Sequence, residues 1–190
     1  MRVRGLRVLL VAVVGAVLVS GCTAETPAND TLPTASEGAE SSAELEPLGP
    51  ADLPMPVEAR ERTPAGAEAF IRYYMDIYND AQMALNADYM EQFSQSCATC
   101  DELISNIRED ASAALSYEGG QVTTDFVSTT VEGDVAEGAF SIQQAELHVR
   151  DSSGTERADL SAPASELSCG AILTWSNSTH SWVFAQWDVN

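Results

Sequence analysis

The chain has 190 residues, with nine basic residues against 29 acidic ones and a formal net charge of −20 at pH 7. This length corresponds to one domain with appendages. A chain this acidic repels phosphate backbones and anionic lipid headgroups, which excludes a nucleic-acid partner and a polybasic contact with a membrane surface. Neither a Gly-X-Y period nor a sustained heptad pattern is present, which excludes collagen and coiled-coil proteins.

Residues 1–21 have the order of residues found in a secretory signal peptide. Three arginines lie within residues 2–7, and an apolar run follows from Val8 to Val19. As a helix this run would extend about 18 Å, well short of the ~30 Å hydrocarbon core of a bilayer. It therefore indicates a signal peptide, and a membrane-spanning helix is not expected.

The tetrapeptide Val19-Ser-Gly-Cys22 resembles the bacterial lipobox. This resemblance implies that Cys22 receives a diacylglycerol thioether, becomes the mature N-terminus and anchors the protein in the cell membrane on its extracytoplasmic face. The alternative is an ordinary secreted protein in which Cys22 is incidental.

Residues 22–62 are predicted to form a disordered, acidic, proline-rich tether. This segment contains no aromatic residue, six of the eight prolines, and nine acidic residues against Arg60 and Arg62. Such a composition buries too little apolar surface to fold alone. On flexible-linker scaling, roughly 40 residues span at least ~35 Å, which would hold a domain clear of the bilayer.

Residues 63–190 are predicted to form an α+β globular domain that begins with three helices. Thr63 offers an N-cap hydroxyl before Pro64, and apolar residues recur at helical spacing as far as Leu85. A capping-box pattern at 88–91 predicts a short second helix, and a better one at 99–102 predicts a third helix that ends at Gly119-Gly120.

Strands are predicted after Gln121, where Val, Thr and Phe replace the helix-forming residues. Their expected ranges are 122–131, 135–149, 167–176 and 182–188, with a further short pairing strand within 155–160. The apolar register changes within the second range, which predicts a bulge near Gln143-Gln144. The expected fold has three N-terminal helices packed in a curved, mostly antiparallel sheet of four to five strands.

Three sequence features carry a family resemblance: the string TPAGAEAFIRYY at 63–74, the Cys97-Ala-Thr-Cys100 motif, and Gly119-Gly120. Together they resemble the actinobacterial lipoproteins grouped as domain of unknown function 6318, over about residues 60–190. Those proteins resemble the nuclear-transport-factor-2-like superfamily, in which a curved sheet wraps around helices to form a cone with an apolar pocket. That family has no established activity to transfer, so the resemblance implies only fold and location.

Cysteines are the first candidates for chemistry. The export signal favours a structural disulfide between Cys97 and Cys100 at the start of the third helix, and Cys169 has the strand parity of a buried apolar residue. Alternatives are thiol exchange at Cys97 and Cys100, because a helix N-terminus lowers a thiol pKa, and a bridge from Cys169 to either one. His148 and His180 lack zinc-finger spacing, so no metal and no cofactor are predicted.

Aromatic residues are the second group of candidates. Tyr74, Tyr78, Trp175 and Trp187 could line a cone-shaped pocket, although the alternative is that they are simply core residues. No nucleophile motif or paired-carboxylate spacing is present, and acids on predicted strands, Asp125 and Asp188, are expected to face solvent.

The leading functional hypothesis is a lipid-anchored binding module without a catalytic site, whose partner is a small apolar ligand or another protein. A pocket enzyme of the isomerase or hydrolase type on the same fold is the second hypothesis. A thiol oxidoreductase that uses Cys97 and Cys100 is the third.

Overall fold

The computed structural model describes residues 45–190, and the predicted signal peptide, Cys22 and the first part of the predicted tether lie outside the described residues. Its elements in chain order are a 3-10 helix η1 (Val57–Arg60), the helices α1 (Pro64–Ala84), α2 (Asp88–Gln92) and α3 (Ala98–Ser112), and the strands β1 (Ser116–Gly119), β2 (Val122–Glu132), β3 (Val135–Gln144), β4 (Leu147–Arg150), β5 (Ser165–Ser176) and β6 (Ser181–Val189). None of the helices within 45–190 combines the length and apolar character needed to cross a membrane.

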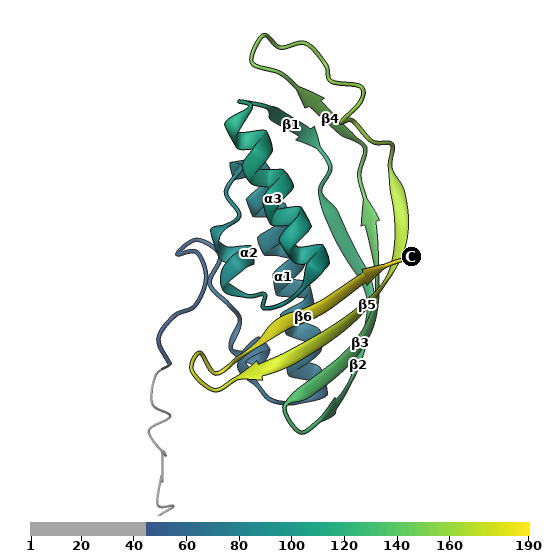
Figure 1. Cartoon of the computed structure of the whole chain (residues 1–190). Coiled ribbons are helices and arrows are strands. Elements are labelled where there is room, and N and C mark those ends of the chain that lie inside the picture. The colour runs from purple at the N-terminus through teal and green to yellow at the C-terminus, as the bar shows by residue number, and fades with distance from the viewer. Residues whose placement is uncertain (1–44) are drawn as a thin grey trace, which may run out of the picture. The chain divides into compact units, whose positions relative to one another are not determined.

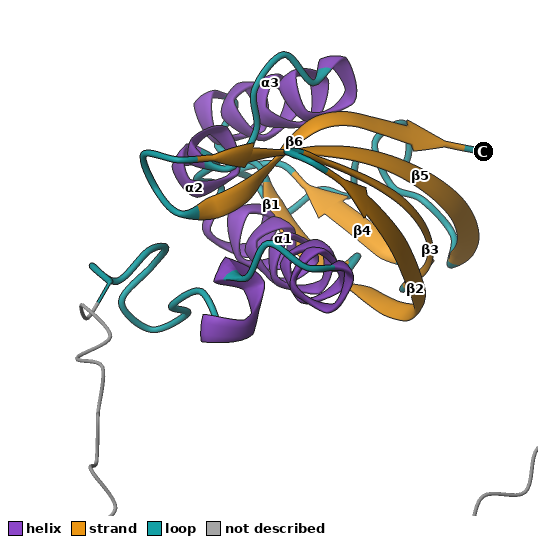
Figure 2. Cartoon of the chain, turned by 90° about the horizontal axis from the view of Figure 1, so that it is seen from below, coloured by secondary structure: helices purple, strands orange, loops and turns teal. Residues whose placement is uncertain are grey.

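Two antiparallel sheets form the β part of the domain. The larger sheet has the strand order β2-β3-β5-β6, and β1 pairs with β4 in a separate two-stranded sheet. The helices lie on one side of the curved larger sheet, and β1 and β4 extend beyond its upper end (Figures 1 and 2). The predicted α+β fold, with three helices packed against a curved antiparallel sheet, is confirmed.

Helix α1 begins as predicted. The Thr63 hydroxyl accepts a hydrogen bond from the backbone N–H of Gly66 at 3.0 Å, and Pro64 occupies the first helical position. The apolar stripe of α1 then packs into the sheet and forms an aromatic core with residues that follow α2 or lie on β6: Phe70, Tyr74, Phe93, Phe184 and Trp187. These large side chains pack against one another between the helices and the sheet.

The other two predicted helix starts are wrong by one or two residues. The N-cap of α2 is Ala87, and Asp88 lies inside the helix with its backbone N–H donated to the Asn86 side chain at 3.0 Å. The N-cap of α3 is Cys97, whose Sγ accepts from the Cys100 N–H at 3.2 Å, so Thr99 lies in the first turn. The N-cap of a helix is the residue whose side chain accepts from the free N–H groups of the first turn. In α3 that acceptor is the disulfide sulfur of Cys97.

The predicted end of the third helix is also wrong. Helix α3 stops at Ser112, and Ala114 adopts the left-handed conformation with φ 51°. The sequence pattern predicts that the helix continues through residues 116–119. These residues instead form β1, which pairs with β4 so that Tyr117 lies opposite Val149. Strand pairing with a segment about 30 residues away in the sequence overrides the local helical pattern here.

The predicted single strand over 135–149 is two strands. β3 ends at Gln144 and β4 starts at Leu147, so the change of apolar parity marks a passage from the larger sheet to the smaller one. The register irregularities lie elsewhere, between Thr124 and Val127 in β2 and at Ala185 in β6, where the pairing with β5 shifts between Ile172 and Leu173. In the range predicted to hold a further short strand, Glu156 forms only an isolated bridge with Arg150.

Residues 46–62, named the strap below, pack on the domain although their composition is that of the tether. Met55 is 7% exposed and Ala59 is fully buried, both in the main core. The indole N–H of Trp182 donates to the Glu61 carbonyl at 2.9 Å. The compact unit therefore begins near residue 44 and not at 63, because a few apolar side chains within a polar segment find partners in the core.

Candidate functional site

A cavity of about 370 Å³ lies between the C-terminal half of α1, the inner face of α3 and the smaller sheet. Its apolar lining comes from α3, β4 and the loop that follows β4: Leu103, Ile107, Leu147, Val149 and Leu160. Its polar lining comes from α1, α3, β1 and the end of β3: Tyr78, Gln82, Asn106, Glu109, Asp110, Tyr117 and Gln144. A hollow that combines apolar walls with convergent polar groups can hold a small molecule.

Two glycines at the end of β1 place one wall of this cavity: Gly119 is the last residue of the strand and Gly120 follows it. Gly119 and Gly120 have φ values of 78° and 79°, which favour glycine. A Cβ atom on Gly119 would lie 2.1 Å from the Glu146 carbonyl oxygen, and one on Gly120 would lie 2.8 Å from Leu147 Cδ1. The pair therefore lets the chain cross closely over the start of β4, so that β1 and β4 stand apart from the larger sheet and form one wall of the cavity.

Two short polar contacts organise the cavity wall. The Gln82 amide donates to the Tyr78 hydroxyl, and the Tyr117 hydroxyl donates to the Asp110 carboxylate. Burial raises the pKa of Tyr78, and burial together with the nearby Asp110 raises the pKa of Tyr117. Both phenols are therefore neutral hydrogen-bonding groups at physiological pH, since a raised pKa disfavours the phenolate.

Of the four aromatic residues predicted to line a pocket, Tyr78 lines this cavity. Tyr74 and Trp187 are buried in the core, with their ring centroids 6.3 Å apart. Trp175 packs edge-on against Trp182 at 5.2 Å, in the part of β5 near the β5–β6 turn. The core interpretation therefore describes Tyr74 and Trp187, and the cavity lies beside the C-terminal part of α1, at Tyr78 and Gln82.

Sequence reasoning missed the polar residues of the site. Gln82 and Asp110 each lie on a helix with an amphipathic pattern, and Tyr117 falls within the range predicted for the end of a helix. One signal was available for Gln82, because it follows Tyr78 by one helical turn on the buried face of α1. A polar residue on an apolar helix face needs a buried partner, and here that partner is the phenol.

The cysteines form the predicted disulfide between Cys97 and Cys100, and Cys169 is a buried free thiol. Both half-cystines are fully buried. Thiol exchange requires an attacking thiolate to reach a disulfide sulfur, and burial prevents this approach. The geometry is therefore that of a structural disulfide that also caps α3.

The acids and histidines singled out from the sequence lie outside the cavity lining. Asp125 accepts from the Gln143 amide at 2.7 Å and Asp188 from the Gln186 amide at 2.6 Å, both in exposed positions. His148 contacts Glu156 at 2.9 Å on the outer side of β4, and this hydrogen bond raises the histidine pKa. Within residues 45–190, no group of three or more His, Cys, Asp or Glu side chains could hold a metal ion.

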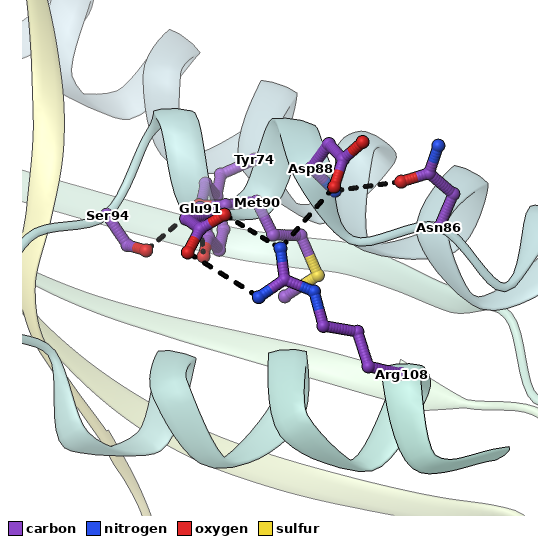
Figure 3. Close-up of polar contacts among 7 residues, drawn as sticks. All are labelled: Tyr74, Asn86, Asp88, Met90, Glu91, Ser94 and Arg108. Carbon is purple, nitrogen blue, oxygen red and sulfur yellow. Dashed lines mark hydrogen bonds and ion pairs between the residues drawn. The ribbon is translucent and has the colours of Figure 1, made fainter. Parts of the chain in front are cut away.

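A second, shallower hollow of about 350 Å³ lies on the surface of α3 beside an ion-pair group. The Arg108 guanidinium reaches from α3 to Glu91 at 2.7 Å and to Asp88 at 3.4 Å on α2 (Figure 3). In the same view, the Tyr74 and Ser94 hydroxyls donate to the Met90 carbonyl beneath this group. The arginine is thus engaged in joining two helices, and this hollow lacks the apolar walls of the cavity.

No protein-family model matches the sequence, and no curated protein matches it. The structure is similar to a nuclear transport factor 2-like superfamily protein from Salmonella enterica serovar Typhimurium, with a TM-score of 0.42, 8% identity, and coverage of 66% of this chain and 91% of that one. It is also similar to Aln2 from a Streptomyces species, with a TM-score of 0.41, 10% identity, and coverage of 75% and 93%. A third similar structure is a putative Ca/calmodulin-dependent kinase II association domain from Exiguobacterium sibiricum, with a TM-score of 0.42, 9% identity, and coverage of 63% and 88%.

Proposed function

We propose that this protein is a lipid-anchored, extracytoplasmic binding module that takes a small molecule into the cavity between α1, α3 and the β1–β4 sheet. The observation that carries the proposal is the cavity itself, about 370 Å³ in volume, which combines apolar walls with converging polar groups. This volume lies within the range of small-molecule sites.

The cavity lining favours binding over catalysis. It contains no histidine, cysteine or serine, and its two phenols are neutral at physiological pH, since burial raises a pKa that is already alkaline. A pocket enzyme needs a nucleophile or a base within hydrogen-bonding reach of its substrate. The one half-buried carboxylate of the lining, Asp110, already accepts a hydrogen bond from Tyr117, so the residues present suit recognition.

The strap supports a tethered arrangement. It is fixed near the N-terminal end of α1, whereas Gln82 brings the cavity to the C-terminal end of the same helix. From Thr63 to Gln82 a helix rises roughly 28 Å. A lipid on Cys22 would therefore hold the domain by the end opposite the cavity, which leaves the cavity free for a ligand.

Native mass spectrometry of the protein from Thr23 onward tests the binding function. We expect a retained small molecule, or uptake from a library of fragments, and loss of both in Leu160→Trp, because the larger side chain fills the cavity from its exposed rim. Val57→Trp is the matched control, since Val57 is exposed on the strap, away from the cavity lining. Equal binding by both variants would contradict the proposed site.

A further inference from the structure

We propose that His148 is a pH-sensitive latch, which holds the loop after β4 beside the cavity in acidic solution and releases it as the pH rises. The loop consists of residues 151–162 and is named the flap below. It carries Leu160 to the rim of the cavity, so release of the flap would open that rim. The latch concerns the flap itself, and its consequence for a ligand rests on the proposed binding function.

The flap runs beside β4 without forming a regular strand, at the upper end of the domain in Figure 1. The Arg157 N–H donates to the Val149 carbonyl at 2.7 Å, and Leu147 and Ala162 exchange two hydrogen bonds of 2.8 and 2.9 Å. Between these contacts the Leu160 N–H bonds within the flap, and its side chain is 40% exposed. A surface segment with few backbone hydrogen bonds to its neighbour opens locally at low cost.

An ion pair on the outer side of β4 adds to these backbone contacts. His148 Nδ1 lies 2.9 Å from Glu156 Oε1 of the flap, and protonated His148 donates to this carboxylate. Arg157, the cation of the flap, is bound to Asp159 within the flap itself. Within residues 45–190, no other ion pair joins the flap to β4.

The charges around His148 make this contact sensitive to its protonation. Glu118 of β1 lies opposite His148 in the strand pair, and Glu146, just before β4, lies 3.7 Å from His148 Nε2. The neighbouring cation is Arg150, which lies 3.8 Å from Glu118. Protonated His148 therefore helps to offset three carboxylates. Neutral His148 leaves Glu156 near two like charges, with Arg150 as the remaining cation, so the flap is held less firmly.

The direction of the pH effect follows from the histidine. The hydrogen bond to Glu156 raises the pKa of His148 above its ordinary value near 6.5, and the charges of Glu146 and Glu118 act in the same direction. The contribution of the pair is therefore fully present below the ordinary pKa and is lost as the pH rises through the raised one. The pair is exposed to solvent, so its effect is a change of a few fold.

Hydrogen exchange of two flap amides measures the latch directly. The amides of Arg157 and Ala162 both donate to β4, and NMR of the ¹⁵N-labelled protein from Thr23 onward follows their exchange. After correction for the intrinsic effect of pH, we expect their protection to fall about threefold between about pH 6 and about pH 8.5. Protection of the Trp175 amide, which donates to the Asp134 carbonyl in the larger sheet, should stay the same.

Variants assign this change to His148. His148→Gln and Glu156→Gln should both show, at about pH 6, the weak flap protection that the unmodified protein shows at about pH 8.5. In Glu156→Gln, an NMR titration should also show that the pKa of His148 falls toward its ordinary value. His180→Asn replaces the other histidine of the chain and is the matched control. Asparagine tolerates the φ of 51° at this position, and the variant should keep the pH dependence of the flap.

The consequence for the cavity is measured with 1-hexanol, a neutral probe whose charge does not change with pH. Its dissociation rate is obtained from NMR line shapes. We expect dissociation to be about threefold faster at about pH 8.5 than at about pH 6, because a ligand leaves when the flap opens. In His148→Gln the two rates should be equal.

The outcomes separate the latch from the proposed function. Unchanged flap protection in His148→Gln at the lower pH, or a pH difference that persists in this variant, would overturn the latch and leave the binding function standing. Loosening of the flap without faster hexanol dissociation would overturn the opening of the rim. Absence of hexanol binding at both pH values, with no retained molecule in the mass spectrum, would overturn the binding function, whereas flap exchange would still decide the latch.

Discussion

The guanidinium of Arg60 in η1 donates to the backbone carbonyl of Thr179 in the β5–β6 turn at 2.8 Å, although the two residues are 119 positions apart. The same side chain donates to the carbonyls of Glu46 at 2.6 Å and His180 at 3.4 Å. One arginine therefore joins the start of the strap, η1 and the turn between two core strands. Figure 1 shows this turn at the end of the domain opposite β1 and β4.

Arg60→Ala is expected to loosen the strap. It removes three hydrogen bonds from a charged donor, and because the site is only partly buried, the expected loss in the free energy of unfolding is about 1–2 kcal/mol. A glutamate-specific protease should then cleave faster at Glu58 and Glu61, as measured by mass spectrometry of a time course.

Arg72→Ala is the control for this effect. Arg72 likewise donates to a backbone carbonyl, that of Thr124 at 2.8 Å, but lies outside the strap. Cleavage of the strap at the same rate in both variants would show that Arg60 does not hold it.

The disulfide variants should separate two roles of Cys97. Replacing both cysteines removes a very small ring, so the cost lies toward the low end of the general ~0 to 5 kcal/mol range. The variant Cys97→Ser/Cys100→Ala keeps a side chain that can accept the backbone N–H of position 100, whereas Cys97→Ala/Cys100→Ala does not. The first should be more stable by about 1 kcal/mol, the usual worth of an N-cap, in urea unfolding. Equal stability would show that Sγ does not act as a cap.

Cys169 should be a slow-reacting thiol. It is buried, and burial raises its pKa above the ordinary value, so that at weakly alkaline pH a smaller fraction is thiolate than in an exposed cysteine. Alkylation by iodoacetamide should therefore be slow in the folded protein and fast in urea.

The variant Ser168→Cys/Cys169→Ala moves the thiol by one position to an exposed site and should react quickly without urea.

Peptide mapping without reductant should recover Cys97 and Cys100 linked to each other. A linked fragment that contains Cys169 would contradict this pairing.

Cys22→Ala tests the proposed anchor. Because acyl chains on this residue would hold the protein in the bilayer, the variant should leave the membrane fraction or remain unprocessed, as seen by fractionation and immunoblotting. Cys169→Ala should stay in the membrane fraction. Continued lipid labelling of the Cys22 variant would refute the lipobox assignment.

The sequence by itself determined the features that depend on neighbours within one turn or one strand. The N-cap at Thr63, the buried stripe of α1 and the alternation in the second half of β2 follow from residues two to four positions apart, and all three are present. The Cys97–Cys100 pair is equally local, since only two residues separate the cysteines, and it forms in preference to a bridge from Cys169.

Tertiary structure decided what depends on distant partners. Residues 116–119 became a strand because they pair with 147–150, and the strap joined the domain because Met55 and Ala59 reach the core. The cavity has the same origin: Gln82, Asp110 and Tyr117 come from three elements, and nothing in their local sequences indicates that they converge. Local pattern reports which face of an element is apolar, whereas the partner that covers this face, or leaves it open as a cavity, is set only when the elements pack.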